Sequence, residues 1–230
     1  MSKAIIWTLQ NSCPSAWVNK YAKFNYSIYH HPIIQLKVNN NFLLLEKEVE
    51  KYDTLIVSSQ FSAIKVASIL KDKYNILAVG HQATKIFKNA GHSIIYTAND
   101  SNELLFYLNT NNKDKILHPC SEKSDIYIWP ENVDSIPFYG PIPNSNFDIS
   151  FLEINSKSII VFGSPSSVDV WFENNYNFKD AILVTIGNTT TKRLAYYKKN
   201  NIISPQISTV NGLCKIIYKH LKCLKYEQTK

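Results

Sequence analysis

Short apolar runs alternate along the chain with longer amphipathic stretches. The runs have the length of buried strands, and the stretches space their apolar residues at helical intervals. This alternation is typical of an α/β protein with mainly parallel sheets, because parallel strands need long crossovers that are usually helices. We expect strands at residues 4–8, 27–30, 54–58, 76–79, 93–96, 115–118, 125–129, 158–162 and 181–186. We expect helices at residues 14–24, 42–51, 61–70, 82–89, 102–109, 168–174, 190–199 and 210–224.

Part of this pattern occurs twice. Residues 55–63 (LIVSSQFSA) resemble residues 160–168 (IVFGSPSSV), and residues 76–85 (ILAVGHQATK) resemble residues 184–192 (VTIGNTTTK) in the same order. Each pair places a small polar loop directly after an apolar run. Two copies of one β–loop–helix–β–loop–helix unit predict two domains of similar fold.

The repeat also predicts how the chain divides. The first strand, at residues 4–8, stands outside both copies and is expected to pair with the C-terminal half. One domain is therefore expected to be discontinuous, with residues 1–35 and 144–230, and residues 36–143 form the inserted second domain. Prolines in the two segments that connect them favour extended chain over helix.

Composition and charge limit the partners. The net charge of +7 and the pI near 9.1 favour an anionic partner. The lysines are scattered, and no motif that binds DNA or RNA is present, so we predict no nucleic-acid partner. No apolar run approaches the roughly 20 residues of a membrane helix, and no signal peptide is recognisable, so a cytoplasmic protein without a membrane partner is expected.

Metal and nucleotide chemistry find little support in the sequence. The four cysteines show no metal-like spacing and are expected to be reduced thiols. His30 and His31 lack nearby acidic or cysteine partners, so we predict no metal site. The glycine patterns of dinucleotide-binding and P-loop proteins are both missing.

Four loops that follow predicted strands are rich in small hydroxylated residues. In parallel sheets, ligands bind beyond the C-terminal ends of the strands, where glycine, free N–H groups and helix dipoles favour carboxylate or phosphate groups. For one such loop alone, helix capping is the better interpretation. Four matched loops in two repeats make anion binding an equal alternative. The candidate ligand-binding residues are Ser58, Ser59, Gly80, Ser164, Ser166, Asn188, Thr189 and Thr190.

At these loops the chain resembles the uroporphyrinogen-III synthase family. Residues 57–59 (VSS) and 161–168 (VFGSPSSV) are similar to its paired F-T-S-x-x-x-V segments. Residues 78–80 (AVG) with 90–92 (AGH) are similar to VG…T…L…G, and residues 185–190 (TIGNTT) are similar to IGPTT. The ordered set covers nearly the whole chain. The resemblance implies two flavodoxin-like α/β domains joined by a two-stranded linker, with the active site in the cleft.

The resemblance also implies an activity. It implies a monomer without cofactor that cyclises hydroxymethylbilane, a linear tetrapyrrole, to uroporphyrinogen III in haem biosynthesis. The reaction loses water and inverts ring D, which makes the enzyme a carbon–oxygen lyase. Tyr139 matches the tyrosine of the family's V-Y-x-T strand, which implies a role in loss of the hydroxyl by hydrogen bonding. On position alone, beside Gly140 in a connecting segment, Tyr139 is more often a structural residue.

The chain departs from the family pattern at several positions. Leu9 stands in place of an arginine, Ala83 stands where a threonine is expected, and Gly140 replaces a glutamate. The stretch from Leu117 to Tyr139 is short and is predicted to lack a full helix. Leu9 and Ala83 motivate an alternative function, a catalytically decayed two-domain protein that binds a polycarboxylate tetrapyrrole without converting it.

Overall fold

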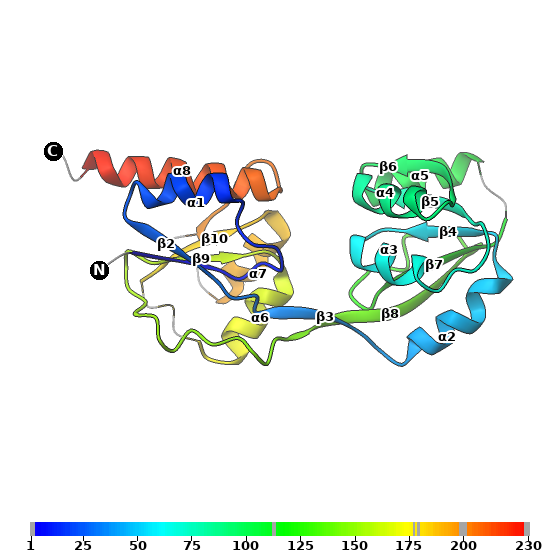
Figure 1. The fold of residues 1–230 in the computed structure, drawn as a ribbon, viewed down its shortest axis with the longest axis horizontal. Helices are drawn as coiled ribbons and strands as arrows, with labels where there is room; N and C mark the ends of the chain where they lie inside the picture. The colour runs from blue at the N-terminus through cyan, green and yellow to red at the C-terminus, as the bar shows by residue number, and fades with distance from the viewer. Residues whose placement is uncertain (1–2, 112–113, 177, 179, 198–201, 228–230) are drawn as a thin grey trace. The chain divides into compact units, whose positions relative to one another are not determined.

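The chain folds into two compact units in the computed structural model, which describes residues 3–111, 114–176, 178, 180–197 and 202–227 (Figure 1). Unit 1 comprises Met1–Gln35 and Pro141–Lys230, and unit 2 comprises Leu36–Gly140. Each unit consists of a β-sheet with helices packed against it.

Unit 1 has a five-stranded sheet in the order β11-β10-β9-β1-β2, and the strands pair in parallel. The strands are β1 (Lys3–Trp7), β2 (Tyr26–His30), β9 (Ile159–Phe162), β10 (Ile182–Thr185) and β11 (Ile202–Ile203). The helices are α1 (Ser15–Ala22), α6 (Pro165–Glu173), α7 (Asn188–Tyr197) and α8 (Val210–Glu227). The pairing of β1 with β9 confirms that the first strand joins the C-terminal half of the chain.

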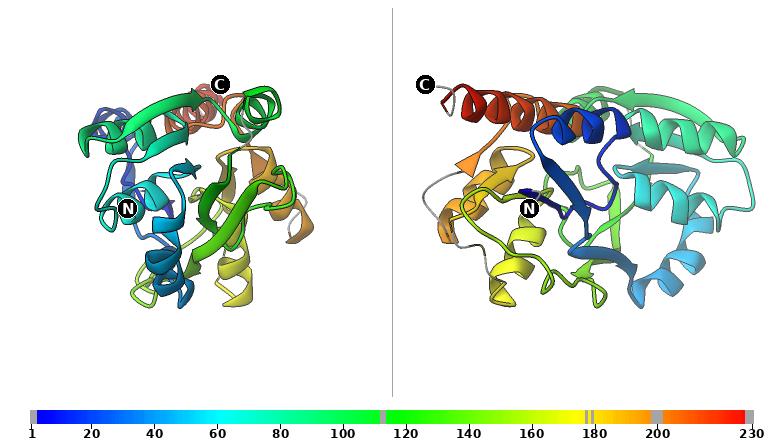
Figure 2. Two further views of the ribbon diagram at one scale, coloured as in Figure 1. Left: turned by 90° about the vertical axis from the view of Figure 1, so that its right-hand side faces the viewer. Right: turned by 60° about the vertical axis from the view of Figure 1, so that its left-hand side comes forward.

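Helices cover both faces of this sheet. Because successive side chains of a strand point to opposite faces, Trp7 of β1 packs with Leu213 of α8, whereas Ile6 packs with Trp171 of α6. Helices α1 and α8 lie side by side, as Figures 1 and 2 show, and α6 contacts α7. Burial on both faces explains why β1 is an unbroken apolar run from residue 4 to residue 7.

Unit 2 has a six-stranded sheet in the order β3-β8-β7-β4-β5-β6. Strands β4, β5, β6, β7 and β8 pair in parallel. The strands are β3 (Ile34–Val38), β4 (Thr54–Val57), β5 (Asn75–Val79), β6 (Ser93–Ala98), β7 (Ile116–Ser121) and β8 (Val133–Pro143). The helices are α2 (Asn41–Glu48), the 3-10 helix η1 (Val49–Lys51), α3 (Gln60–Ala67), α4 (His81–Asn89) and α5 (Ser101–Asn111). Strands β3 and β8 continue across the boundaries of the unit.

The two faces of this sheet are covered differently. Val66 of α3 and Phe87 of α4 pack on one face with Leu55 of β4. On the other face, Leu104 of α5 packs with Ile56, and Trp129 from the segment between β7 and β8 completes the layer. Trp129, which belongs to a connecting segment, thus covers one part of this sheet face, and helix α5 covers another part.

The strand predicted at residues 125–129 is wrong. These residues form turns and bends, and the described residues 122–132 contain no helix, as the short stretch predicts. The alternation in DIYIW fits a strand, but Tyr127 is exposed and Trp129 is buried under tertiary packing rather than by sheet pairing. Helix α6 begins at Pro165 rather than at the predicted residue 168. The last two residues of the helix predicted at 190–199 lie outside the described residues.

Candidate functional site

The predicted ligand-binding residues lie at the C-terminal ends of parallel strands. Ser58 and Ser59 follow β4, and Gly80 follows β5 in unit 2. The equivalent loops of unit 1 follow β9 and β10, with Ser164 at the start of α6 and Asn188 at the start of α7. Within each unit, two helix N-termini therefore flank the same edge of the sheet, where backbone N–H groups and helix dipoles favour anions.

Two of the serine hydroxyls cap helices. Ser59 Oγ accepts a hydrogen bond from the backbone N–H of Ser62 at 3.0 Å. Ser164 Oγ accepts one from the backbone N–H of Ser167 at 3.2 Å, and the Ser167 hydroxyl accepts one in return from the N–H of Ser164. Capping is therefore correct for both serines. Each hydroxyl still keeps a hydrogen with which it can donate.

The loops at Gly80 and Gly187 also share a hydrogen bond, as the two serine caps do. Thr84 Oγ1 donates to the carbonyl of Gly80 at 3.3 Å, and Thr191 Oγ1 donates to the carbonyl of Gly187 at 3.1 Å. Gly80 has φ 83° and ψ 148°, a conformation that is essentially restricted to glycine. This backbone turns the chain sharply from β5 into α4 and leaves the first N–H groups of α4 without a side-chain cap.

The loop at residues 187–191 in unit 1 exposes only some of the hydrogen-bond donors predicted there. Asn188 and Thr189 are exposed, whereas Thr190 is 1% exposed. The Thr190 side chain therefore packs beneath the loop, and Asn188 and Thr189 are the residues that a ligand can reach there. Ser166, in the first turn of α6, is partly exposed.

A polar cluster connects the residue after β4 with the interior of β7 and the first residues of β8 in unit 2. Ser58 Oγ is 3.1 Å from His118 Nε2, and Nδ1 of the same ring is 3.3 Å from Ser135 Oγ. His118 is 1% exposed, and burial lowers the pKa of its ring to about 4. Sequence reasoning missed His118, because a single histidine in an apolar strand gives no signal until strand pairing places the two serines beside it.

Tyr139 bonds to the next serine along the chain, on the other face of the sheet. Its hydroxyl is 2.7 Å from Ser59 Oγ, and its ring packs on Phe61 at a centroid distance of 4.7 Å. The residue is 5% exposed, and burial raises the pKa of the phenol, although the bond with Ser59 partly opposes the shift. The phenol therefore keeps its proton at neutral pH and has one hydrogen that it can donate.

A carboxylate lies beside Gly140, the residue after Tyr139. Glu122 follows β7, and its backbone N–H donates to the Tyr139 carbonyl at 2.8 Å. A Cβ atom built on Gly140 falls 2.1 Å from Glu122 Oε1, so the side chain of Glu122 occupies the space beside this glycine. The space beside residue 140, which has no side chain, is thus filled by a carboxylate from the residue after β7.

The equivalent position in unit 1, where β1 lies beside β9, is apolar. Leu9, two residues after the end of β1, packs on Gly163, and a Cβ atom built on Gly163 falls 2.7 Å from Leu9 Cγ. Thr8 is buried, and its hydroxyl donates to the Val161 carbonyl at 2.6 Å. Strands β1 and β9 are the neighbours at which the strand order reverses, the usual position for a ligand in an open parallel sheet. Leu9 is itself buried, so it covers the Gly163 backbone at this position with aliphatic atoms.

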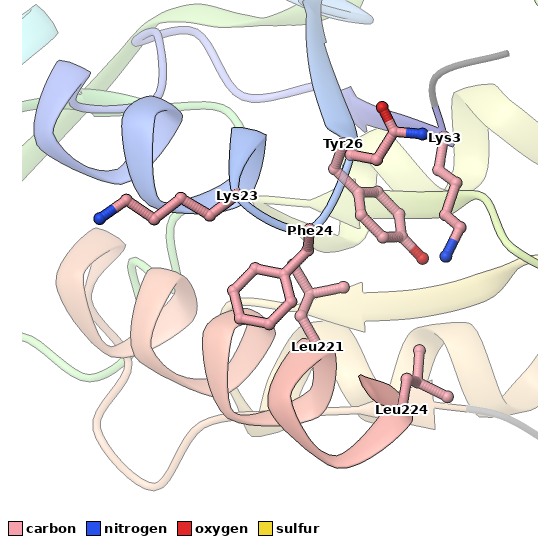
Figure 3. Close-up of a pocket in the computed structure, with 7 residues that line it drawn as sticks. Lys3, Lys23, Phe24, Tyr26, Leu221 and Leu224 are labelled. Carbon is pink, nitrogen blue, oxygen red and sulfur yellow. The ribbon is translucent and has the colours of Figure 1, made fainter. Parts of the chain in front are cut away.

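Two surface hollows of unit 1 lie at opposite ends of its sheet. The hollow in Figure 3, of about 290 Å³, lies beside Lys3 and Tyr26, the first residues of β1 and β2, and is thus remote from the hydroxyl-rich loops. A hollow of about 490 Å³ lies between residues 204–209 and α8 and includes Lys215 and Lys219, one helical turn apart. It adjoins the Gly187 loop, because Ser208 packs against Gly187. Its two ammonium groups suit carboxylates.

No group of three or more His, Cys, Asp or Glu side chains is placed to hold a metal ion among the residues that the structure describes. In the same part of the chain, no helix is both long enough and apolar enough to cross a membrane.

The fold and the loops define a class, an α/β protein with parallel sheets whose strand ends carry helix N-termini and small hydroxylated residues. Residues 15–215 match the family described as uroporphyrinogen-III synthase HemD. The chain belongs to the uroporphyrinogen-III synthase family, which confirms the resemblance seen in the sequence. The family implies an enzyme of tetrapyrrole synthesis with a tetrapyrrole substrate and a function in haem biosynthesis, and the alternative of a decayed binding protein is not favoured.

Solved structures of similar fold come from two bacteria. Uroporphyrinogen-III synthetase from Helicobacter pylori superposes with a TM-score of 0.69 at 14% identity, covering 96% of this chain and 100% of that chain. A mutant uroporphyrinogen III synthase from the extremely thermophilic bacterium Thermus thermophilus gives a TM-score of 0.63 at 13% identity, covering 98% and 100%. At these identities the likeness establishes the α/β fold. No curated protein matches the sequence.

Proposed function

We propose that this chain cyclises hydroxymethylbilane to uroporphyrinogen III with loss of water and inversion of ring D, as a carbon–oxygen lyase. The observation that carries the proposal is the family match over residues 15–215, because this range includes all four hydroxyl-rich loops and Tyr139. Closure of a flexible linear tetrapyrrole has to be directed to one isomer. Holding the two ends of the chain in one orientation is an entropic contribution that a set of fixed donors can provide.

The carboxylates of the substrate bind the donors at the strand ends. In unit 2 these are Ser58, Ser59 and the N–H groups that follow Gly80. In unit 1 they are the first turn of α6 with Ser164 and Ser166, and Asn188 with Thr189 at the start of α7. The partial positive charge of each helix N-terminus and the net charge of +7 support this assignment. Thr190 supports its loop from below, in accordance with its burial.

Tyr139 assists departure of the terminal hydroxyl. Ser59 Oγ accepts the N–H of Ser62 and can donate its own hydrogen to the Tyr139 oxygen, 2.7 Å away. The phenolic hydrogen then remains free to bond to the leaving hydroxyl, which takes up a proton from solvent and departs as water when its bond to the methylene carbon breaks. The methylene carbon left behind is electrophilic and bonds to ring D, and ring D returns one proton to solvent when the inverted macrocycle is complete, so the net loss is one water. A donor of this kind contributes about 10²- to 10⁴-fold, and the lower end is expected because the leaving step is intrinsically easy.

The test is the conversion of hydroxymethylbilane by the full chain, with separation of the type III and type I products. Type III product formed faster than spontaneous closure supports the proposal, and type I product alone at the spontaneous rate refutes it. Tyr139→Phe is expected to lower turnover. Tyr52→Phe is the matched control, because Tyr52 also donates a hydrogen bond, to Asp134 at 2.7 Å, but precedes β4 and so lies at the other end of the sheet.

The remaining properties of the enzyme belong to the same proposal. We infer a cytoplasmic monomer without cofactor, metal, nucleic-acid or membrane partner, in which units 1 and 2 are separate domains connected through β3 and β8. The order β2-β1-β9-β10-β11 supports a flavodoxin-like assignment of unit 1. Sedimentation of the full chain tests the monomer. Limited proteolysis near residues 35 and 140 tests the division into domains, and cleavage first within a sheet would contradict it.

A further inference from the structure

His118 connects two serines across three strands of unit 2. The register of β7 with β8 places His118 opposite Ser135, and Ser58 follows β4, which pairs with β7 on its other side. The ring nitrogens face these serines at 3.1 Å and 3.3 Å. The indole of Trp129 packs edge-on against the imidazole at a centroid distance of 5.1 Å, which fixes the plane of the ring.

Burial keeps this imidazole neutral at pH 7, because it lowers the pKa to about 4. A neutral imidazole has one N–H donor and one nitrogen acceptor, and the position of its proton decides the direction of both bonds. Two arrangements are possible. In the first, Ser135 donates to Nδ1, and the Nε2–H group donates to Ser58 Oγ. In the second, the Nδ1–H group donates to Ser135, and the Ser58 hydroxyl donates to Nε2.

The two arrangements differ in what Ser58 offers to a ligand. In the first, the hydroxyl hydrogen of Ser58 is free and can donate to a carboxylate. In the second, that hydrogen is used inside the protein, and only oxygen lone pairs face an approaching anion. An anionic ligand therefore selects the arrangement with the proton on Nε2 of His118.

We propose that His118 is a positioning residue that turns the Ser58 hydroxyl hydrogen toward a carboxylate of the substrate. The proposal rests on the proposed function for the identity of the anion. His118 itself does not contact the substrate, because it is buried. Ser135 acts one step further away by donating to Nδ1, and it thereby holds the proton on the opposite nitrogen.

Two amide variants separate positioning from packing. The amide nitrogen of glutamine reaches the place of Nε2, whereas that of asparagine reaches only the place of Nδ1. His118→Gln is therefore expected to keep the KM for hydroxymethylbilane within about twofold. His118→Asn and Ser58→Ala are each expected to raise it roughly five- to tenfold, as expected for one lost hydrogen bond, with kcat little changed. The proposal fails if His118→Gln and His118→Asn change KM equally. It also fails if KM keeps its wild-type value in both amide variants and in Ser58→Ala.

A double-mutant cycle gives the second test. His118 acts only through Ser58. The double variant with Ser58→Ala and His118→Asn is therefore expected to have the same KM as Ser58→Ala alone. Independent, multiplicative effects would overturn the proposal. Urea unfolding midpoints of all variants show whether a variant with a raised KM is still folded at the assay conditions.

The proton can also be located directly. In full-length protein labelled with nitrogen-15 at histidine, the ring nitrogen shifts distinguish a protonated from an unprotonated nitrogen, and His118→Gln assigns the signal. The complex with uroporphyrinogen III is expected to carry the proton on Nε2, and a proton on Nδ1 would refute the proposal. Type III formation by the wild-type chain decides the proposed function separately, so failure of one inference is distinguishable from failure of the other.

Discussion

The buried ring of His118 is expected to make the stability of the protein depend on pH between about 4 and 6.5. Its pKa is about 4 in the folded chain, against an ordinary value of 6.5. The unfolded chain thus binds a proton at this residue at a higher pH than the folded chain does. The contribution of His118 to the free energy of unfolding is therefore fully present above about pH 6.5, and it is lost as the pH falls toward 4.

The magnitude follows from the difference between the two pKa values. At about 1.4 kcal/mol for each pH unit, the complete effect amounts to about 3 kcal/mol. Between pH 7 and pH 4.5, where protonation of the folded form is still incomplete, about 2 kcal/mol of it is expressed. This is a large share of the roughly 5–15 kcal/mol that stabilises a typical domain.

The assay is urea unfolding of the wild-type chain and of His118→Gln at pH 7 and at pH 4.5, followed by circular dichroism. The variant cannot bind the proton, so its free energy of unfolding is expected to fall by about 2 kcal/mol less than that of the wild type. His81→Gln is the control, because the side chain of His81 is exposed and its replacement is expected to leave the wild-type difference intact. Parallel losses in the wild type and in His118→Gln would refute the argument.

Three further outcomes follow from the loops. Gly163→Ala is expected to destabilise the chain by roughly 1–3 kcal/mol because the new methyl group meets Leu9. Urea unfolding measures this loss of stability, and adding Leu9→Ala to the same chain is expected to relieve the steric clash. Gly80→Ala is expected to cost roughly 1–3 kcal/mol through backbone strain alone, since no atom lies within 4 Å of the added Cβ atom, and an unchanged unfolding midpoint would contradict this. Replacing Lys215 and Lys219 together by Gln is expected to raise the KM for hydroxymethylbilane and to weaken its increase with salt; a salt dependence equal to that of the wild type would exclude these lysines from carboxylate binding.

Much of the fold follows from local pattern. Apolar runs buried on both faces mark β1, β4, β9 and β10, and the repeated loops mark where ligand-binding strand ends lie. Pattern failed at residues 125–129, where alternation suggested a strand. Trp129 is buried there because the sheet face beneath it lacks a helix, a condition that arises only after the sheet has assembled.

The candidate site was less accessible to sequence reasoning. Serine after a strand predicts both a helix cap and a ligand donor, and the structure shows that Ser59 is a cap that also meets Tyr139. The contacts of His118 depend on the order of three strands, which no local pattern specifies. Burial of Thr190 likewise depends on packing beneath the loop, whereas its neighbour Thr189 is exposed.

The strand orders give the repeat a topological meaning. Unit 2 has the order β6-β5-β4-β7-β8 beside its edge strand β3, and unit 1 has β11-β10-β9-β1-β2. The sequence repeat equates β4 with β9 and β5 with β10, so β7 and β8 correspond to β1 and β2. The two sheets therefore share one spatial order, but unit 1 places its last two strands first in the chain, which is why unit 1 is interrupted between β2 and β9.

The equivalent positions then differ in chemistry. Ser58, bonded to His118, corresponds to Gly163, which lies under Leu9. At the same topological position, one sheet therefore carries a partly exposed hydroxyl, and the other carries a backbone that the buried Leu9 covers. Under the proposed function, we expect a carboxylate of the tetrapyrrole at Ser58 and none at Gly163.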